Sequence, residues 1–130
     1  MTDAELIETA RSAMQFARAD YSHFNVGAAI LCANGKVFTG CNIESASYGL
    51  TVCAERVALW KALSEGEDKF VKLAVTVDTP NPAAPCGACR QVLYEYSPEL
   101  IIIMAGSNGS IKSCSIGELL PDAFTKKDLS

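Results

Sequence analysis

Three cysteines and one glutamate carry the most chemical information in this sequence. The segment Cys53-Ala54-Glu55 is followed, further along the chain, by Pro85-Cys86-Gly87-Ala88-Cys89. A structural zinc site is closed by four protein ligands, whereas a catalytic zinc keeps three protein ligands and one open position. Cys53, Cys86 and Cys89 supply three thiolates, and Glu55 supplies a carboxylate close to the first of them. The spacing predicts a catalytic Zn²⁺ site in which Glu55 carries protons.

Other interpretations of these cysteines remain open from the sequence alone. A single Cys-x-x-Cys pair also occurs in structural zinc sites and in thioredoxin-like redox pairs. A fourth ligand for a closed zinc site is available from Cys32, Cys41, Cys114 or His23. A redox pair would leave the distant Cys-Ala-Glu segment without a role. Zinc deaminases account for both segments, because they combine three ligands with a non-ligating glutamate and end in Pro-Cys-x-x-Cys. This favours hydrolysis of an amino group on a nucleobase-like ring.

The charge of such a site requires compensation. Zn²⁺ with three thiolates carries a net charge of about −1, which weakens its ability to acidify water. Both segments fall at expected helix N-termini, where the helix dipole favours negative charge. Arg56 and Arg90, each close to a cysteine, are further candidates to offset the charge, although Arg56 is also consistent with a surface ion pair. Residues two apart on a helix point about 200° apart, so Cys53 and Glu55 should converge only at an irregular or first-turn position.

Composition limits the class of protein. The 130 residues, 49% of them hydrophobic, suit a single globular domain over residues 1–130. The net charge of −4 argues against nucleic acid as a partner. We expect no membrane span and no signal peptide, and therefore a cytoplasmic protein whose six cysteines are thiols. Cys32, Cys41 and Cys114 are expected to be small packing residues.

The remaining sequence predicts the elements that position these residues. We expect helices over about 2–19, 51–65, 85–97 and 116–120, and strands over about 26–33, 36–42, 71–77, 100–105 and 111–114. Thr2 and Glu5 form a capping box, and Thr51 and Pro85 suit the starts of the second and third helices. Asn34-Gly35 and Asn108-Gly109 predict hairpin turns. This order predicts a three-layer α/β/α fold around a mixed, five-stranded sheet with a largely parallel centre.

The second expected helix is apolar on most of its surface. Val57, Leu59, Trp60 and Leu63 leave it little polar face. A helix that is apolar all round is buried on every side, which is hard to arrange in a small monomer. We expect a subunit interface here, with a central helix covered by the C-terminal tail as the alternative.

The chain resembles the cytidine deaminases of the small, zinc-dependent, homotetrameric class over nearly its whole length. The segments that carry the resemblance are Tyr21-Ser22-His23-Phe24-Asn25-Val26-Gly27-Ala28-Ala29, Gly40-Cys41-Asn42-Ile43-Glu44, Ala46-Ser47-Tyr48-Gly49-Leu50, Cys53-Ala54-Glu55-Arg56, Pro85-Cys86-Gly87-Ala88-Cys89-Arg90-Gln91-Val92 and Leu119-Leu120-Pro121-Asp122-Ala123-Phe124. Several independent segments in the right order are more specific than the zinc motif alone.

The resemblance implies an activity and a role for each site residue. The implied reaction is hydrolytic deamination of free cytidine and deoxycytidine to uridine and deoxyuridine, with release of ammonia. By resemblance, zinc is bound by Cys53, Cys86 and Cys89, and Glu55 shuttles protons. The residues implied in substrate binding are Phe24 on the pyrimidine, Asn42 and Glu44 on the ribose, the backbone of Ala54 on the base, and Tyr48 and Phe124 across a subunit boundary of a homotetramer.

Two departures from the family pattern are mild. Ser45 stands where asparagine is expected, and Ala84 stands where serine often precedes the proline. Neither residue is a ligand or a proton carrier, so they bear on substrate preference. The alternatives are a deaminase of a cytosine-nucleoside antibiotic such as blasticidin S, a nucleic-acid deaminase, and a zinc-stabilised binding protein without activity. The sugar-binding segment from Asn42 to Glu44 argues against the first, and the acidic charge argues against the second.

Overall fold

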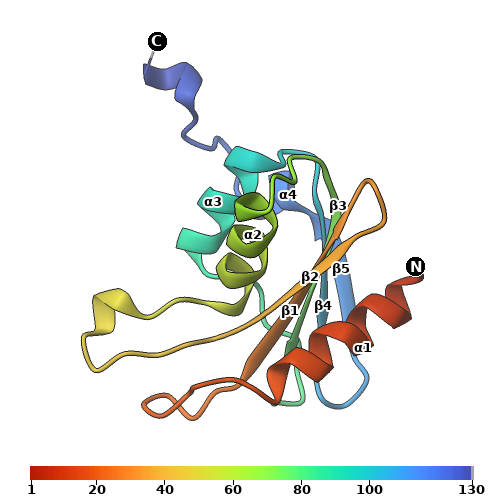
Figure 1. Cartoon of the computed structure of the whole chain (residues 1–130), viewed down its shortest axis with the longest axis vertical. Helices are drawn as coiled ribbons and strands as arrows, with labels where there is room; N and C mark the ends of the chain where they lie inside the picture. The colour runs from red at the N-terminus through yellow and green to blue at the C-terminus, as the bar shows by residue number, and fades with distance from the viewer. Residues whose placement is uncertain (130) are drawn as a thin grey trace.

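A five-stranded sheet lies between helices in the computed structural model, which describes residues 1–129 (Figure 1). The elements are α1 (Asp3–Met14), β1 (Val26–Cys32), β2 (Val37–Cys41), η1 (Tyr48–Leu50), α2 (Ala54–Ser64), β3 (Phe70–Val77), α3 (Gly87–Tyr96), β4 (Ile101–Ala105), β5 (Ile111–Ser115), α4 (Ile116–Leu119) and η2 (Lys126–Leu129). Among residues 1–129, no helix combines the length and apolarity needed to cross a bilayer.

The two faces of the sheet pack against different helices. Ala28 and Ile30 of β1 belong to the larger core cluster with residues of α2, α3 and α4, whereas Ala29 packs in a second cluster against α1. The same alternation places Leu73 and Val75 of β3 on the larger side. Successive side chains of a strand point to opposite faces, so each strand contributes to both clusters. The result is the expected three-layer α/β/α fold.

The sheet is mixed, with strand order β2-β1-β3-β4-β5. Strand β1 pairs antiparallel with both β2 and β3, β3 pairs parallel with β4, and β4 pairs antiparallel with β5. The expected direction of the helix-connected strands is confirmed, because β2, β3 and β4 all run the same way. The centre is less parallel than expected, however, because the crossover through α2 passes over β1, which lies between β2 and β3.

Both predicted hairpin turns are present. Gly35 and Gly109 have φ of 91° and 87°, in the left-handed region that glycine adopts without strain. These turns set the register of β1 with β2 and of β4 with β5.

The expected extension of the first helix to residue 19 is wrong, because α1 ends at Met14. Arg18 instead forms an isolated parallel bridge with Ile43, and its N–H donates to the Asn42 oxygen at 2.8 Å. Tertiary pairing overrides the helical propensity of this segment. It also brings the turn of residues 20–25 beside the end of β2.

The expected starts of the second and third helices are also wrong by a few residues. The N-cap of α2 is Cys53, because the Thr51 hydroxyl accepts the N–H of Ser45 at 3.0 Å. The N-cap of α3 is Cys86, so Pro85 precedes the helix and does not lie in its first turn. Both cysteines have extended backbone, with ψ of 154° and 168°. Each helix therefore begins directly after a cysteine.

Close backbone packing fixes the start of α2 on the sheet. A Cβ atom added to Gly40 of β2 would lie 2.4 Å from the Ala54 oxygen, which is too short for any side chain. Glycine at this position lets the first turn of α2 sit directly on β2. The motif segment is thereby held by the scaffold.

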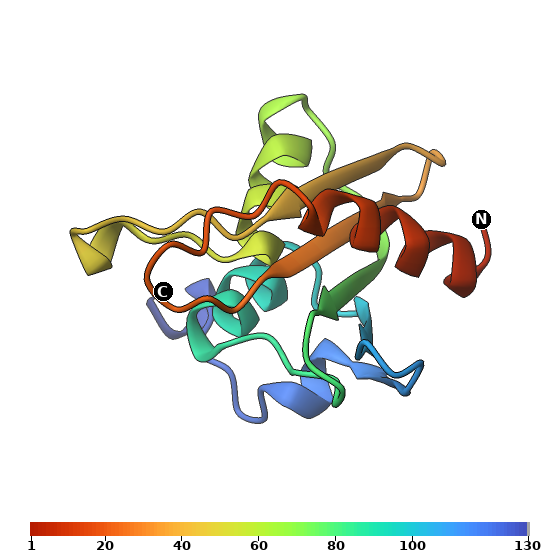
Figure 2. The same ribbon diagram turned by 90° about the horizontal axis from the view of Figure 1, so that it is seen from below.

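Two parts of the chain project from this body. The segment around η1 extends away from the sheet in both ribbon views (Figures 1 and 2), and the C-terminal segment with η2 extends from the end of the molecule in Figure 1. Exposed apolar side chains occur on both, notably Tyr48, Leu50 and Phe124.

Candidate active site

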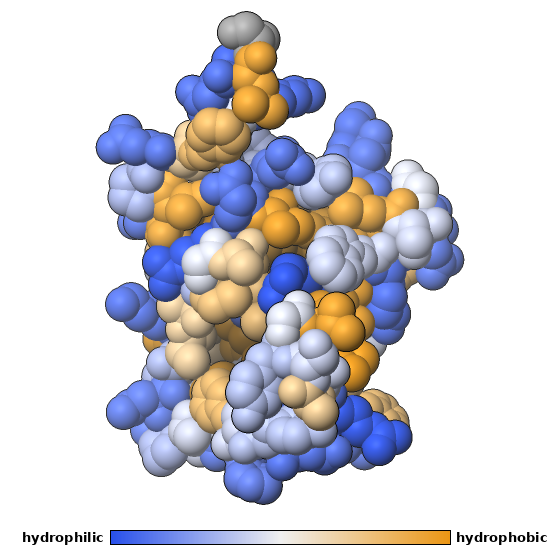
Figure 3. All heavy atoms as spheres, turned by 90° about the vertical axis from the view of Figure 1, so that its left-hand side faces the viewer, coloured by the Kyte–Doolittle hydropathy of each residue, from blue (hydrophilic) through white to orange (hydrophobic). Residues whose placement is uncertain are grey.

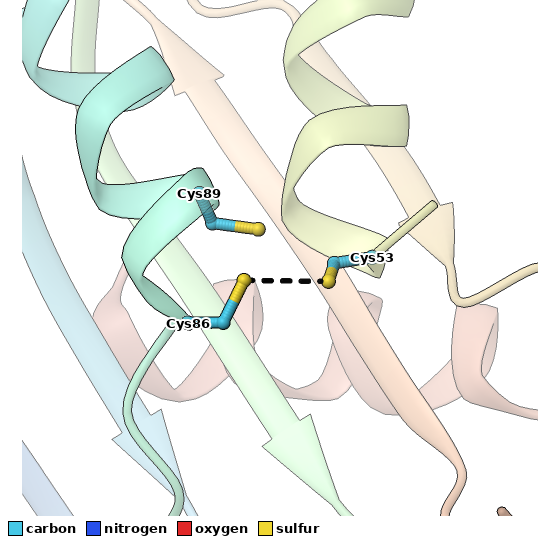
Figure 4. A group of neighbouring side chains, drawn as sticks. All are labelled: Cys53, Cys86 and Cys89. Carbon is cyan, nitrogen blue, oxygen red and sulfur yellow. Dashed lines mark hydrogen bonds between the residues drawn. The ribbon is translucent and has the colours of Figure 1, made fainter. Parts of the chain in front are cut away.

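The three motif cysteines meet between the first turns of α2 and α3 (Figure 4). Cys53 is the N-cap of α2, and Cys86 and Cys89 are the N-cap and third helical residue of α3. The extended backbone of Cys53 resolves the geometric question raised by the sequence. Because Cys53 lies just outside the regular helix, the 200° separation expected for residues two apart does not apply to Cys53 and Glu55.

The sulfur geometry fits a zinc ion. All three Sγ atoms lie within 4.8 Å of one another, and those of Cys53 and Cys86 are 3.6 Å apart. A tetrahedral zinc with Zn–S bonds of about 2.3 Å places its sulfur ligands about 3.8 Å apart. The donor set is therefore three thiolates at nearly the required spacing, with burial increasing from Cys86 through Cys53 to Cys89.

Arg56 lies beside this cluster, and its expected charge-compensating role stays a prediction. Its Nη2 lies 3.5 Å from the Cys53 Sγ, and its guanidinium carbon lies 5.9 Å from the centre of the Trp60 ring. Interaction with the Cys53 sulfur raises the pKa of Arg56, so the guanidinium is charged. Among the described residues, its buried Nε has no hydrogen-bond partner. The arginine is packed beside the thiolates and is not paired with a surface carboxylate.

The thiols of Cys53 and Cys89 are linked through one hydrogen bond. Hydrogen bonding from the Cys89 thiol lowers the pKa of Cys53 to about 5, with Arg56 adding to the effect and burial opposing it. The same hydrogen bond and burial raise the pKa of Cys89, which keeps its proton. A metal must displace that proton, because zinc binds thiolate and not thiol.

Glu55 is held next to the cluster in an apolar environment. Its residue surface is only 4% exposed. Burial raises the pKa of the Glu55 carboxyl to about 7, and the neighbouring Cys53 thiolate adds to this. A carboxyl that titrates near neutrality can both accept and donate a proton at working pH.

A cavity of about 220 Å³ opens beside the cluster. Its lining includes most of the residues that the sequence singled out, namely Phe24, Asn42, Glu44, Cys53, Ala54, Glu55 and Cys86. The structure thus brings together residues from the turn before β1, the end of β2 and the two helix starts. Tyr48 and Phe124 do not line this cavity, and they are 77% and 58% exposed.

Asn42 and Glu44 form a polar corner of the cavity. The Asn42 amide donates to the Phe24 oxygen at 2.8 Å and to Glu44 Oε2 at 3.5 Å, and its Oδ1 accepts the Val26 N–H at 2.9 Å. Glu44 Oε1 accepts the N–H groups of Tyr21 and Ser22 at 3.0 and 2.9 Å. Both side chains are therefore held in place without a ligand.

The expected charge-compensating role of Arg90 stays a prediction, and its hydrogen bonds show a structural role. Its Nε donates to the Pro85 oxygen at 2.7 Å and its Nη1 to the Leu119 oxygen at 2.9 Å. These bonds tie the loop before Cys86 to the end of α4. Arg90 therefore stabilises the N-terminus of α3, because two of its side-chain donors bind backbone carbonyls.

Sequence reasoning missed several residues of the site. Ser22 and Thr51 line the cavity, and Val75 and Val77 of β3 contribute apolar lining. Trp60 was considered only as an interface residue, although it stacks near Arg56. Ser22 lies inside a segment that carried the family resemblance, so its position was a usable signal. The valines gave none, because a buried strand residue looks the same whether or not it borders a cavity.

Comparisons with known proteins agree with this site. A family model described as the cytidine and deoxycytidylate deaminase zinc-binding region matches residues 1–105. A cytidine deaminase of Halalkalibacterium halodurans is 49% identical over 126 residues, which cover 96% of each chain. A blasticidin-S deaminase of Bacillus cereus is 32% identical over 133 residues, covering 95% of this chain and 93% of the other.

The fold comparison gives the same answer. A crystal structure of a cytidine deaminase from Burkholderia pseudomallei superimposes with a TM-score of 0.93 at 50% identity. The match covers 95% of this chain and 100% of the other. The similarity therefore extends through the sheet, the helices and the site.

Proposed function

The chain belongs to the zinc-dependent cytidine and deoxycytidylate deaminase family, and from this premise we propose that it hydrolyses the amino group of free cytidine and deoxycytidine. The products are uridine or deoxyuridine and ammonia, as in pyrimidine salvage. One observation carries the proposal: Cys53, Cys86 and the buried carboxyl of Glu55 border the same 220 Å³ cavity, and the Cys89 sulfur lies within 4.8 Å of the other two sulfurs.

Cys53, Cys86 and Cys89 hold the zinc in this proposal. Zinc, when bound, acts as a Lewis acid that makes water a usable nucleophile near neutral pH. Arg56 balances the excess negative charge of the three thiolates through its contact with Cys53. The N-termini of α2 and α3 add partial positive charge on the same side.

Glu55 moves the protons. Its carboxylate accepts a proton from the water that attacks the amino-bearing ring carbon and delivers it to the ring nitrogen. The carboxylate then accepts the second proton from the hydroxyl now on that carbon and delivers it to the amino nitrogen, which leaves as ammonia. Burial supports this double role, because it raises the pKa of Glu55 to about 7. The apolar lining of the cavity limits competing proton exchange with bulk water.

The remaining cavity residues bind and orient the nucleoside. Phe24 offers a ring face to the pyrimidine, and the Ala54 backbone contacts the base at the start of α2. Asn42 and Glu44 bind sugar hydroxyls at the polar corner. Asn42 can accept a further hydrogen bond at Oδ1, and one of its amide hydrogens is engaged only in the long 3.5 Å contact with Glu44. An uncharged substrate also suits a chain of net charge −4.

We further infer a homotetramer with active sites at subunit boundaries. Exposed apolar side chains support it, namely Ile43, Tyr48, Leu50 and Phe124 in the loops and projecting segments and Trp60 on α2. Figure 3 shows apolar surface gathered in patches between polar residues on the side that carries the η1 segment. Tyr48 and Phe124 would complete a neighbour's cavity, since they do not line their own. If light scattering showed a stable, active monomer, this inference would be contradicted.

The six free cysteines are consistent with a protein that acts in the reducing cytoplasm.

A steady-state assay tests the proposed function. Cytidine should lose its amino group, which is measured by the change in ultraviolet absorbance. Metal analysis should find one zinc per chain. Removal of zinc with a chelator should abolish turnover, and added zinc should restore it. Turnover of blasticidin S but not cytidine would shift the proposal to the antibiotic deaminases. A zinc-loaded protein that turns over neither would favour a binding protein.

A further inference from the structure

The turn before β1 holds the sugar-binding carboxylate, and the inference drawn from it rests on the proposed function. This turn, residues 20–25, borders the cavity through Ser22 and Phe24. His23 between them has φ of 58°, a left-handed conformation, and its N–H donates to the Ala19 oxygen at 2.9 Å. Non-glycine residues keep this conformation only where surrounding contacts fix it. Ser22, the preceding residue, makes further hydrogen bonds within and beyond this turn.

Ser22 is bonded to Glu44 by two separate groups. Its N–H donates to Glu44 Oε1 at 2.9 Å, and its hydroxyl donates to Glu44 Oε2. The Ser22 Oγ also accepts the Phe24 N–H at 3.1 Å. A hydroxyl has a single proton, so an Oγ that accepts from Phe24 and donates to Glu44 has a defined direction. A chain of hydrogen bonds therefore links the residue under the base to the residue beside the sugar.

The acceptor capacity of Glu44 is fully used without a ligand. A carboxylate has about four lone-pair directions. The Oε1 atom accepts hydrogen bonds from the N–H groups of Tyr21 and Ser22. The Oε2 atom accepts hydrogen bonds from the Ser22 hydroxyl and the Asn42 amide. The Asn42 contact is the weakest of the four, because its 3.5 Å length lies beyond ordinary hydrogen-bond distances. A sugar hydroxyl that binds Glu44 must replace that one.

We propose that Ser22 is a positioning residue: its two hydrogen bonds hold the Glu44 carboxylate in the orientation in which, under the proposed function, that carboxylate and the Asn42 amide receive the 3′-hydroxyl of the substrate. The inserted hydroxyl donates to Glu44 Oε2 and accepts from Asn42 Nδ2, so both protein groups stay satisfied. The 3′-hydroxyl is the ring hydroxyl that cytidine and deoxycytidine share. Ser22 keeps its own bonds throughout, and the carboxylate needs no reorganisation when the substrate arrives.

The ionisation of Glu44 agrees with this arrangement. The Ser22 hydroxyl and N–H are the largest causes that lower the pKa of Glu44, with Tyr21 and Asn42 adding smaller effects. The carboxylate is thus kept as a pure acceptor near neutral pH. Without Ser22, Oε2 would be free to turn towards Asn42 or solvent.

The test compares two substrates that differ at the 3′ position. The kcat/KM values for deoxycytidine and for 2′,3′-dideoxycytidine are measured with the parent protein, Ser22→Ala, Ser22→Thr and the control Ser107→Ala. We expect Ser22→Ala to lower kcat/KM for deoxycytidine about tenfold, mainly through KM, as for loss of one hydrogen bond to a charged group. The value for dideoxycytidine should change by less than about twofold. Ser22→Thr restores the hydroxyl and should restore the preference, and Ser107→Ala on the far β4–β5 turn should match the parent.

Each other outcome decides the question. Equal losses on both substrates would overturn the inference, because Ser22 would then only stabilise the turn. No loss on either would also overturn it. If Ser22→Ala does not fold, Ser22→Cys must show the same loss confined to the hydroxyl-bearing substrate. A parent protein inactive on deoxycytidine would instead overturn the proposed function, which separates the two failures.

Discussion

The four α-helices within residues 1–129 begin in two different ways. At α1 and α4, the N-caps Thr2 and Ser115 form reciprocal capping boxes with Glu5 and Glu118. At α2 and α3, the N-caps are Cys53 and Cys86, and within residues 1–129 neither makes a side-chain capping bond. The first pair satisfies its own terminal N–H groups, whereas the second pair turns its sulfurs towards a common point.

This difference separates stability from function. A capped helix start stabilises the fold, and replacing Ser or Thr caps by Ala costs about 0.5–2 kcal/mol. A helix with cysteine as its N-cap lacks that stabilising hydrogen bond. Its first backbone N–H groups stay unpaired, and they and the positive end of the helix dipole lie beside the thiolates. The site therefore lies where two helix N-termini lack a stabilising cap and where the carboxyl of Glu55 is buried.

Replacement of a cysteine N-cap in the site by an ordinary capping residue should have the largest effect on zinc binding and turnover. Cys86→Ser places a good N-cap residue on α3 but removes a thiolate ligand. We expect zinc to be lost on dialysis and turnover to fall more than about 100-fold. This exceeds the loss of activity that typically follows mutation of a residue hydrogen-bonded to a metal ligand. The metal-free variant should be as stable as the metal-free parent or slightly more stable. Metal analysis, turnover and thermal melting measure these effects.

Cys114→Ser is the matched control for this change. Cys114 lies on β5, outside the sulfur cluster, so zinc content should stay at the parental value. Zinc retained in Cys86→Ser, or lost in Cys114→Ser, would contradict the assignment of ligands.

Removal of charge compensation at α2 should have a smaller effect. Arg56→Gln takes away the cation 3.5 Å from the Cys53 sulfur and leaves three thiolates with excess charge. We expect roughly a 10- to 100-fold loss of turnover or zinc affinity with the fold retained. The measurements are chelator competition and steady-state kinetics. Arg11→Gln on α1 is the control, because Arg11 lies outside the sulfur cluster and pairs with Glu8 at 3.3 Å. Equal behaviour of the two variants would reduce Arg56 to a surface residue.

Breaking a structural cap should have the smallest effect and should spare the site. Ser115→Ala removes the cap of α4, and we expect a loss of about 1 kcal/mol in unfolding free energy. Zinc content and kcat/KM should be unchanged. Urea titration and the cytidine assay measure both, and a change in zinc content would show that the two kinds of helix start are not independent.

The cost of this substitution should depend on pH. Hydrogen bonds from Ser115 lower the pKa of Glu118, so the folded protein favours the carboxylate. A lowered folded pKa contributes stability above the unfolded pKa of 4.5, and this is lost as pH falls through the folded value. The difference between parent and Ser115→Ala should therefore be larger at pH 7 than at pH 3. A constant difference would mean that Glu118 does not take part.

The sequence predicted the chemistry of the site better than its geometry. Residue type alone indicated that Cys53, Cys86, Cys89 and Glu55 belong together, and the structure places the three sulfurs within 4.8 Å of one another. Turn chemistry likewise predicted both hairpins, because Gly35 and Gly109 occupy conformations that few other residues adopt. These signals are local and depend on residues with unusual properties.

Features set by tertiary contact were not predictable in the same way. The end of α1 at Met14 depends on pairing of Arg18 with Ile43, and the start of α2 at Cys53 depends on the bond between Thr51 and Ser45. The placement of β1 between β2 and β3 is a choice among sheet orders that local pattern does not encode. The position of Ser22 in a segment that carried the resemblance was a signal, but its hydrogen bond to Glu44, far along the chain, was not predictable.

Replacement of Glu55 by glutamine tests the central claim most directly. Glu55→Gln keeps the size of the side chain and one acceptor oxygen but cannot carry a proton at neutral pH. Zinc should remain near one per chain and cytidine should still bind by calorimetric titration, while turnover falls by at least about 10²–10⁴. Glu95→Gln, an exposed change on α3, should behave as the parent. Parental turnover in Glu55→Gln would remove this residue from the mechanism, and loss of zinc would show that Glu55 is a ligand and not the proton carrier.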